Sequence, residues 1–370
     1  MSEKFELTFI TNIPSPYNLD LFEALASRAS LSVYYYSSIE SERQWSLRIE
    51  SDNYVSKVFK KDIIHHFFQR INRNLYFNFQ CVQVALTNNS EFFVLGGNYF
   101  APNTLLLLLV LRFRQKKVFW YGEKLLPSSS TQKNLLKRVL ISPINLFTKA
   151  IFAVGEGAIS SYRSYGYKKP IFNTPYSINN SRFGKKSNYK HPEQDKIIFL
   201  SSGSLIYRKG YDLAIQAFNL LDDRIKSRVE YWILGDGPLL TYLQGLSNPG
   251  LTVRFMGFVE PSDIPKYFNS ASAFLLTSRY DGWGVVINEA MAAGLPLIVT
   301  NTCGAAEYVS DEGGFVVNCD ADEISSKIAY LVSNPKELAR FSNYNLQKAQ
   351  SISSDCISKR VFDHICNFQK

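Results

Sequence analysis

The chain has 370 residues, of which 46% are hydrophobic and 20% charged, and its formal net charge is +9. This length is comfortable for two domains, and the hydrophobic fraction excludes a disordered chain. Five cysteines without a C-x-x-C pair exclude a disulfide scaffold and suit a reducing compartment such as the cytosol. The most apolar run, residues 104–111, is far shorter than the roughly 20 residues that span a bilayer, so we expect a buried helix there.

The positive charge is concentrated in the first half of the chain. Residues 1–185 hold 23 Lys or Arg and 12 Asp or Glu, a net charge of +11, and the remainder carries −2. Such a basic half suits the phosphates of nucleic acid, anionic lipid or a lipid-linked diphosphate. Apolar and basic residues mixed over 133–147 indicate peripheral contact with an anionic membrane, and a solvated basic face over a core helix is the alternative. No recognised nucleic-acid-binding module is present, so nucleic acid is not expected as a partner.

In chain order, the first half alternates short apolar segments with polar turns and helical stretches. The opening segment, FELTFI, runs into a loop at Pro14–Asn18, which proline makes rigid, and a helix follows. The stretch FFVLGGNYFAPN, at 92–103, contains a second predicted strand that ends in Gly96–Tyr99. The stretch KVFWYGEKL, at 117–125, contains a third and places Glu123 just past it. This alternation predicts an α/β domain.

The second half begins with a strand at 197–200 and the stretch SSGSLIYRKGYDLAIQAF at 201–218. Arg208 and Lys209 stand side by side before Gly210, and an amphipathic helix follows. Two cations in a strand-to-helix loop suit a diphosphate, and an ordinary solvated pair is the alternative. YWILGDGPLL (231–240) and VRFMGFVE (253–260) then predict two more strands, each with a glycine turn.

The stretch SRYDGWGVVINEAMAAGLP, at 278–296, contains the most informative turn. We expect a strand over 271–277, a loop over 278–284, a helix over 285–293 and a further strand over 297–300. Gly294 fits the end of that helix. In a parallel sheet the loop lies at the carboxyl edge of the first strand, where open α/β sheets bind ligands.

The residues of this loop favour a ligand that combines phosphate with hydroxyl groups. Gly282 lets a ligand approach the backbone closely, and the amides of residues 284–286 open a helix, where phosphate binds readily. Asp281 and Glu289 repel phosphate but accept hydrogen bonds from hydroxyls. A nucleotide sugar has hydroxyls on both sides of a diphosphate. The alternative is structural, with Asp281 as a turn residue and Glu289 as a favourable charge near the helix start.

Five motifs in order across residues 200–310 resemble the retaining glycosyltransferases of family four, which have the GT-B fold. They are YRKG, LGDGP, FMGFV, the run from Asp281 to Glu289, and Gly304–Glu307. The resemblance implies two Rossmann-like, doubly wound α/β domains that face each other across a cleft, with a C-terminal helix returning to the first domain. We therefore predict an acceptor-binding domain over 1–187 with the helix at 350–370, and a nucleotide-sugar-binding domain over 188–349.

The resemblance also implies roles for individual residues. Glu289 would hold the ribose, Asp281 would face the transferred sugar, and Lys209 with Arg208 would neutralise the diphosphate. The other donor-binding residues would be Gly282, Trp283, Gly284, Val285, Val286, Ser204, Gly235, Phe258 and Val259. The acceptor-side cleft would contain Pro16, Tyr17, Asn18, Gly97, Asn98, Tyr99 and Glu123. Two positions depart from the family pattern, because Asp281 replaces a glutamate and Ser204 stands where many members have an arginine.

The predicted protein is a glycosyltransferase that moves a hexose-type sugar from a nucleoside-diphosphate donor to a hydroxyl of a glycan or lipid-linked acceptor. We expect retention of configuration, a role in cell-surface polysaccharide assembly, and a cytoplasmic location at the inner face of the membrane. No metal or other cofactor is implied, since the histidines form no metal motif. The alternatives are a non-catalytic nucleotide-sugar-binding partner and a sugar-nucleotide epimerase of GT-B type. Glycosyl transfer to a defined acceptor distinguishes the enzyme from both.

Overall fold

The computed structural model describes residues 4–38, 49–60, 70, 77–184 and 196–369. The chain forms two compact units, of which unit 1 comprises Met1–Ser177 with Ser354–Lys370, and unit 2 comprises Ile178–Ser353. Unit 1 thus ends at Ser177, whereas the predicted boundary at 187/188 lies outside the described residues. Each unit is built around one sheet of parallel strands, which confirms the predicted pair of doubly wound α/β domains.

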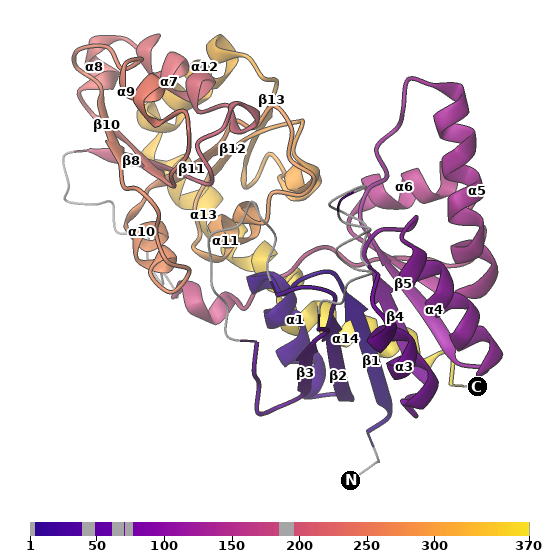
Figure 1. Cartoon of the computed structure of the whole chain (residues 1–370). Helices are drawn as coiled ribbons and strands as arrows, with labels where there is room; N and C mark the ends of the chain where they lie inside the picture. The colour runs from indigo at the N-terminus through magenta and orange to yellow at the C-terminus, as the bar shows by residue number, and fades with distance from the viewer. Residues whose placement is uncertain (1–3, 39–48, 61–69, 71–76, 185–195, 370) are drawn as a thin grey trace. The chain divides into compact units, whose positions relative to one another are not determined.

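The sheet of unit 1 has the strand order β3-β2-β1-β4-β5-β6-β7, and its neighbouring strands run parallel. Figure 1 labels the first five strands of this order. The strands are β1 (Glu6–Thr11), β2 (Ser30–Tyr35), β3 (Val55–Val58), β4 (Phe92–Gly96), β5 (Lys117–Gly122), β6 (Ala150–Ala153) and β7 (Ile171–Asn173). The direction of winding reverses between β1 and β4, so the turns after these two strands flank the switch point of the sheet.

Helices cover both faces of this sheet. They are α1 (Pro16–Ala26), α3 (Phe79–Thr87), α4 (Pro102–Phe113), α5 (Thr131–Phe147), α6 (Glu156–Ser164) and α14 (Ser354–Cys366). One face packs against α1 and α14, through a core that includes Leu21 and Ile357. The other face packs against α3, α4, α5 and α6, through a core that includes Leu107 and Ile141.

The C-terminal helix α14 belongs to unit 1, although the preceding 176 residues form unit 2. Ile357, Val361 and Ile365 are buried against the first strands and α1. Arg28 pairs with Asp355 at 2.5 Å between Nη2 and Oδ1, which attaches the start of α14 to the end of α1. The predicted return of the last helix to the first domain is therefore confirmed, with the helix at Ser354–Cys366 inside the predicted range 350–370.

The apolar run at residues 104–111 lies in α4, as a helix is predicted there. Leu107, Leu108 and Leu111 are fully buried, whereas Leu109 is 43% exposed and Phe113, at the end of the helix, is 86% exposed. The run is therefore buried on one side only. Within the described part of the chain, no helix combines the length and hydrophobicity needed to cross a bilayer.

Helix α5 contains Pro143, which cannot donate the hydrogen bond that an α-helix directs to the carbonyl four residues earlier. That carbonyl belongs to Val139, and the hydroxyl of Ser142 donates to it at 2.7 Å. The freed carbonyl therefore keeps a partner, and α5 runs through the proline over 17 residues.

The sheet of unit 2 has the order β10-β9-β8-β11-β12-β13. Its strands are β8 (Ile197–Ser202), β9 (Val229–Leu234), β10 (Thr252–Phe255), β11 (Ala273–Leu276), β12 (Leu297–Thr300) and β13 (Gly314–Val317). Its helices are η1 (Asn180–Phe183), η2 (Tyr207–Lys209), α7 (Tyr211–Asn219), α8 (Asp223–Lys226), α9 (Leu240–Gln244), α10 (Ile264–Ser270), α11 (Val286–Ala292), η3 (Gly304–Tyr308), α12 (Ala321–Ser333) and α13 (Pro335–Ser351). Here the winding reverses between β8 and β11, so the turns after these strands flank the switch point.

Candidate functional site

The two turns at the switch point of unit 2 are locked together at Gly210. This residue has a φ of +67°, and a Cβ atom there would lie 2.0 Å from the carbonyl oxygen of Thr277, at the end of β11. The Thr277 hydroxyl donates to the Gly210 carbonyl oxygen at 2.8 Å. Only glycine fits both the backbone conformation and the space, so the turn after β8 is held directly against the turn after β11.

This contact brings the predicted catalytic residues Arg208 and Lys209 close to Asp281, which lies about 70 positions later in the sequence. Lys209 Nζ lies 2.5 Å from Asp281 Oδ2, and the two side chains are only 15% and 13% exposed. Arg208 Nη1 lies 4.0 Å from the same oxygen and donates to the Tyr280 carbonyl at 2.9 Å. A cation and a carboxylate thus share a largely buried position at the carboxyl edge of the sheet, where charge–charge interactions are stronger than in water.

Arg279 holds this arrangement in place, and the sequence did not identify it. Its guanidinium donates to both carboxylate oxygens of Asp212, at 2.8 and 2.6 Å, and these bonds raise the pKa of Arg279. It also stacks over the ring of Tyr207, with 4.0 Å to the ring centroid. The backbone amide of Arg279 donates to the Arg208 carbonyl at 2.8 Å, so the position of the cation pair depends on Arg279.

The loop after β11 rests on the η3 turn, as the predicted motif Gly304–Glu307 suggests. The amide of Gly304 donates to the Asp281 carbonyl at 3.0 Å, and the amide of Ala305 donates to the Trp283 carbonyl at 2.7 Å. A Cβ atom at Gly304 would lie 2.3 Å from the carbonyl oxygen of Gly282, so glycine is required here too. The loop that carries Asp281 is therefore fixed by backbone bonds from the end of the next strand.

The loop leads directly into α11. Gly284 has a φ of +88°, Val285 caps the helix and Val286 begins it, while Glu289 lies in the first turn and is half-buried. The indole of Trp283 is buried and donates to the side-chain oxygen of Asn288 at 3.2 Å. Its predicted contribution was through the backbone, and the structure adds a side chain that anchors the loop to α11.

The remaining predicted donor-binding residues follow the other strands at the same edge of the sheet. Gly235, after β9, crosses the turn after β8 so closely that a Cβ atom would lie 2.0 Å from the Gly203 carbonyl oxygen. Ser204 is exposed in the turn after β8, and Phe258, which follows β10 with Val259, is 43% exposed. Every predicted donor-side residue therefore lies at the carboxyl end of β8, β9, β10 or β11.

In unit 1, the predicted acceptor-side residues also lie at the carboxyl edge, with one correction. Pro16, Tyr17 and Asn18 form the first turn of α1 rather than a loop, because Ser15 accepts a hydrogen bond from the Asn18 amide at 3.3 Å and caps the helix. Proline is favoured in this first turn because its missing amide hydrogen is not needed there. The rigid segment predicted from the two prolines is thus a capped helix start.

The turn after β4 packs against the turn after β1. Gly97 has a φ of +124°, and a Cβ atom there would lie 2.5 Å from the side-chain oxygen of Asn12. Asn98 and Tyr99 continue this turn, and the Asn98 carbonyl accepts from the Thr104 hydroxyl at 2.9 Å, which ties the turn to α4. Tyr99 packs against the hydrophobic core that lies between the sheet and the helices α4 and α6.

Glu123 lies at the edge of a tyrosine cluster that the sequence did not reveal. It is exposed and accepts a hydrogen bond from the buried hydroxyl of Tyr176. The ring of Tyr176 lies 4.3 Å from that of Tyr17 and 6.2 Å from that of Tyr121. Burial, with smaller contributions from Glu123 and neighbouring tyrosines, raises the pKa of both Tyr121 and Tyr176 well above its usual value, so both hydroxyls stay protonated.

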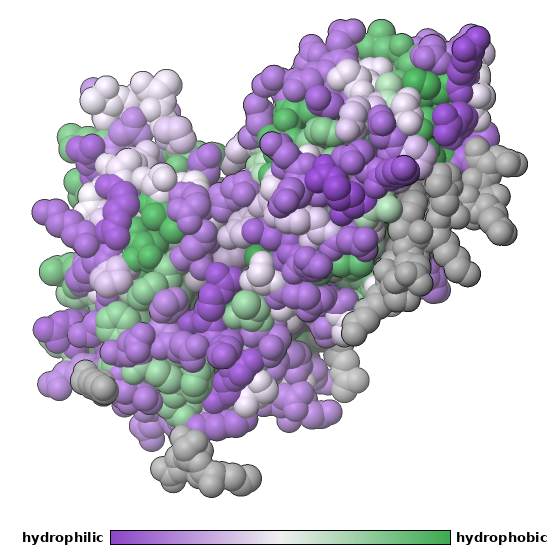
Figure 2. Space-filling view, turned by 180° about the vertical axis from the view of Figure 1, so that it is seen from behind, coloured by the Kyte–Doolittle hydropathy of each residue, from purple (hydrophilic) through white to green (hydrophobic). Residues whose placement is uncertain are grey.

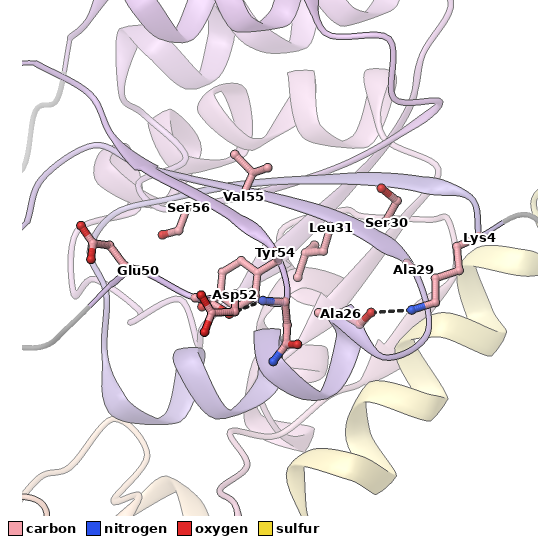
Figure 3. A pocket seen from close by; sticks show the side chains of 12 residues that line it. Lys4, Ala26, Ala29, Ser30, Leu31, Glu50, Asp52, Tyr54, Val55 and Ser56 are labelled. Atoms are coloured by element: carbon pink, nitrogen blue, oxygen red, sulfur yellow. Dashed lines mark hydrogen bonds between the residues drawn. The ribbon is translucent and has the colours of Figure 1, made fainter.

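A shallow pocket of about 660 Å³ lies elsewhere in unit 1, at the amino ends of the first strands (Figure 3). It is lined by the start of β2 and by residues 50–56, and Lys4 donates to the Ala26 carbonyl at 2.9 Å on its rim. None of the predicted site residues lines it, and it lies at the opposite edge of the sheet from Gly97 and Glu123. It is therefore separate from the candidate site.

Three comparisons with known proteins agree with this geometry. Residues 184–348, which contain all the donor-side residues, match the family model described as "Glycosyl transferases group 1". The chain is 31% identical over 164 residues to the "Uncharacterized glycosyltransferase MJ1607" of Methanocaldococcus jannaschii, covering 38% of this chain and 41% of the relative. It is 30% identical over 131 residues to the "O-antigen chain mannosyltransferase B" of Escherichia coli, covering 34% of each. The chain thus spans well under half the length of these curated relatives.

A solved structure extends the likeness of fold to both units. The structure of Anabaena Alr3699/HepE in complex with UDP aligns with 98% of this chain and 100% of its own, with a TM-score of 0.76 and 16% identity. At this identity the likeness establishes the fold alone. Both units therefore share the fold of that structure, as the sequence motifs predicted.

Proposed function

We propose an enzymatic activity for this chain, whose second unit carries a domain of the glycosyl transferases group 1 family. The protein moves a hexose-type sugar from a nucleoside-diphosphate donor to a hydroxyl of a glycan or lipid-linked glycan acceptor, with retention of configuration, in cell-surface polysaccharide assembly. The observation that carries this proposal is the buried Lys209–Asp281 pair at the switch point of unit 2. Similarity to the O-antigen chain mannosyltransferase B of Escherichia coli supports this setting.

The donor would lie along the carboxyl edge of unit 2. Glu289, in the first turn of α11, would accept hydrogen bonds from the ribose, and Asp281 would accept them from the transferred sugar. The diphosphate would lie between Lys209 and the amides of residues 284–286, which open α11. Phe258 and Val259, after β10, would contact the base, and Gly235 would let the backbone approach the ligand closely.

The charge that develops on the leaving diphosphate would be stabilised by Lys209, by Arg208 and by these backbone amides. Lys209 is already paired with Asp281, so the diphosphate would compete with the carboxylate for the same ammonium group. This cationic set supplies the positive charge that a metal ion supplies in other transferases, and we therefore propose that transfer needs no metal.

The acceptor would be bound by unit 1. The turns after β1, β4 and β5 bring Tyr17, Gly97 and Glu123 to one edge of its sheet, and aromatic rings with a carboxylate suit a sugar ring with hydroxyls. We further propose that the enzyme works at the cytoplasmic face of an anionic membrane. Five free cysteines and the basic first half of the chain support this setting.

A thermal-shift panel of nucleoside-diphosphate sugars tests the donor site. One donor should raise the melting temperature of the wild type, and Lys209→Ala and Glu289→Ala should each lose that response. The matched controls are Lys266→Ala and Glu312→Ala, which alter exposed residues of the same unit outside the proposed donor site. If the two site variants respond to the donor as the controls do, the proposed site is wrong.

A second assay distinguishes an enzyme from a protein that only binds the nucleotide sugar. The donor found in the panel is incubated with glycan and lipid-linked acceptors, and the products are analysed by mass spectrometry. A glycosylated acceptor supports the proposal. Conversion of the free nucleotide sugar without acceptor would identify an epimerase, and binding without any turnover would identify a non-catalytic partner.

A further inference from the structure

Helix α5 exposes large apolar side chains among its polar ones, which is unusual for the outward face of a surface helix. Leu135, Val139 and Leu146 are 62%, 59% and 69% exposed, and Leu136 beside them is 57% exposed. The first three lie at positions i, i+4 and i+11, which places them along one side of the helix. These four residues are called the α5 stripe below. Ser142 is exposed between Val139 and Leu146, so the stripe is a row of apolar side chains with one small polar residue in it. Large exposed apolar surface marks a contact with another molecule or a membrane.

The direction of the α5 stripe is fixed by the opposite side of the helix. Ile141 and Ile144 are fully buried in the core of unit 1. Near the start of the helix, Asn134 accepts a hydrogen bond from the hydroxyl of Tyr165 at 3.0 Å, which attaches α5 to the end of α6. The helix therefore cannot turn its apolar stripe inward without losing this core and this bond.

Basic residues lie on the same helix as the stripe and just after it, and acidic residues are almost absent from this part of the sequence. Residues 92–155 contain nine Lys or Arg and a single acidic residue, Glu123, so this stretch carries +8 of the net charge of +9. On α5 and just after it, Lys133, Arg138 and Lys149 are exposed. Figure 2 shows that hydrophobic residues reach the surface between hydrophilic ones on one face of the molecule.

The neighbouring helix α4 repeats this pattern. It contacts α5 and exposes Leu109 and Phe113, which are one helical turn apart and 43% and 86% exposed. Arg112 lies between them in the sequence and is exposed as well. Two adjacent helices therefore each present apolar side chains flanked by positive charge.

This surface suits two occupants, a second copy of the chain or a lipid bilayer, and its positive charge decides between them. Pairing of two copies through the same face would bring the basic residues of both copies together, and like charges repel. An anionic bilayer offers an apolar layer for the stripe and negative headgroups for the basic residues. We propose that the α5 stripe and its basic neighbours dock unit 1 onto an anionic lipid bilayer. This inference rests on the proposed function in one respect: it names the surface through which the proposed enzyme would contact the membrane.

Vesicle flotation tests the apolar part of the proposal. Wild-type protein should float with vesicles of phosphatidylglycerol and phosphatidylcholine, and should not float with phosphatidylcholine alone. The triple variant Leu135→Ser, Val139→Ser, Leu146→Ser should partition at least tenfold more weakly, because it removes three exposed apolar side chains. Leu220→Ser is the matched control, since Leu220 is 54% exposed in unit 2 and should contribute nothing.

Neutralising the basic residues tests the electrostatic part. The double variant Lys133→Gln, Arg138→Gln should lower partitioning about fivefold for each residue changed, the effect of removing one basic residue near an anionic surface. Lys336→Gln, in unit 2, is the control and should bind as the wild type does. The altered side chains are exposed, so the melting temperature of each variant should match that of the wild type and exclude misfolding as the cause.

Three results would overturn the inference. They are wild-type binding to neutral vesicles as strong as to anionic ones, unchanged binding of the triple variant, and a wild-type dimer in sedimentation velocity that the triple variant abolishes. The last would assign the stripe to a second copy. The nucleotide-sugar thermal shift is measured on the same variants and should be unchanged, so failure of the membrane surface remains distinguishable from failure of the donor site.

Discussion

The two units have the same kind of sheet, but the turns at their switch points differ in chemistry. In unit 2 the turns after β8 and β11 hold a buried ion pair, Lys209 and Asp281, and cross each other through glycine. In unit 1 the turns after β1 and β4 hold uncharged Asn12 and Gly97, and aromatic rings follow on the adjoining elements. Cationic groups with backbone amides suit a diphosphate, whereas aromatic and hydroxyl groups suit a sugar ring.

The comparison shows that the fold determines where a ligand can bind, whereas the residues of the turns determine which class of ligand binds there. At either switch point, two turns from adjacent strands leave the sheet in opposite directions, and a ligand can lie between them. The side chains of those turns then decide whether charge or ring surface meets the ligand. The following predictions test this division between the units, from the largest expected effect to the smallest.

Lys209→Ala should lower the rate of glycosyl transfer about 10²- to 10³-fold, because it removes a preorganised cation from the developing charge of the leaving group. The rate constant is measured with saturating acceptor. Lys266→Ala, on the exposed surface of unit 2, is the control and should react as the wild type does. A rate within threefold of the wild type for Lys209→Ala would contradict the assigned role.

Gly210→Ala should destabilise the protein by more than about 3 kcal/mol, because the added methyl group meets the Thr277 carbonyl and the backbone conformation is unfavourable. Gly250→Ala separates the two causes. Gly250 has a φ of +90° but open space around it, so only the conformational cost of about 1–2 kcal/mol should appear. Urea unfolding measures both, and equal losses would show that the crossing of the turns is not tightly packed.

Tyr176→Phe should raise the KM for acceptor about tenfold and leave the donor thermal shift unchanged, because Glu123 loses the hydroxyl that orients it. Burial raises the pKa of Tyr176, so its hydroxyl stays protonated and the effect should be constant between about pH 6 and pH 9. Tyr242→Phe, on an exposed tyrosine of unit 2, is the control. A larger change in donor affinity than in acceptor KM would break the proposed division between the units.

Asp281→Asn should strengthen binding of the free nucleoside diphosphate several-fold while transfer falls. The carboxylate competes with phosphate for Lys209 and repels it, and the amide does neither. Isothermal titration with the nucleoside diphosphate measures the affinity. Weaker binding by this variant would mean that Asp281 orders the site more than it competes with the ligand.

The sequence predicted the elements of unit 2 closely, since local signals define them. The strand at Leu297–Thr300 and the helix at Val286–Ala292 follow from an apolar β-branched run and from a helix-favouring run ended by Gly294. Resemblance to a known family selected Lys209 and Asp281 as site residues. Their contact depends on the crossing of two turns distant in sequence, so no local pattern could reveal it.

The partners that orient the site were missed for the same reason. Arg279 meets Asp212 across 67 positions, and Tyr176 meets Glu123 across 53, so neither pair leaves a periodic signal. At Pro16–Asn18 the error was local, because two prolines suggested a rigid loop. The signal for a helix was present in Ser15, which caps it, followed by proline in the first turn.

The most direct test of the account is the affinity of the selected nucleotide sugar for variants of the two switch points. Isothermal titration compares Lys209→Ala in unit 2 with Asn12→Ala in unit 1, after both are shown to be folded. The account predicts that Lys209→Ala weakens donor binding at least tenfold while Asn12→Ala binds it as the wild type does. Loss of donor affinity in Asn12→Ala with normal affinity in Lys209→Ala would contradict it.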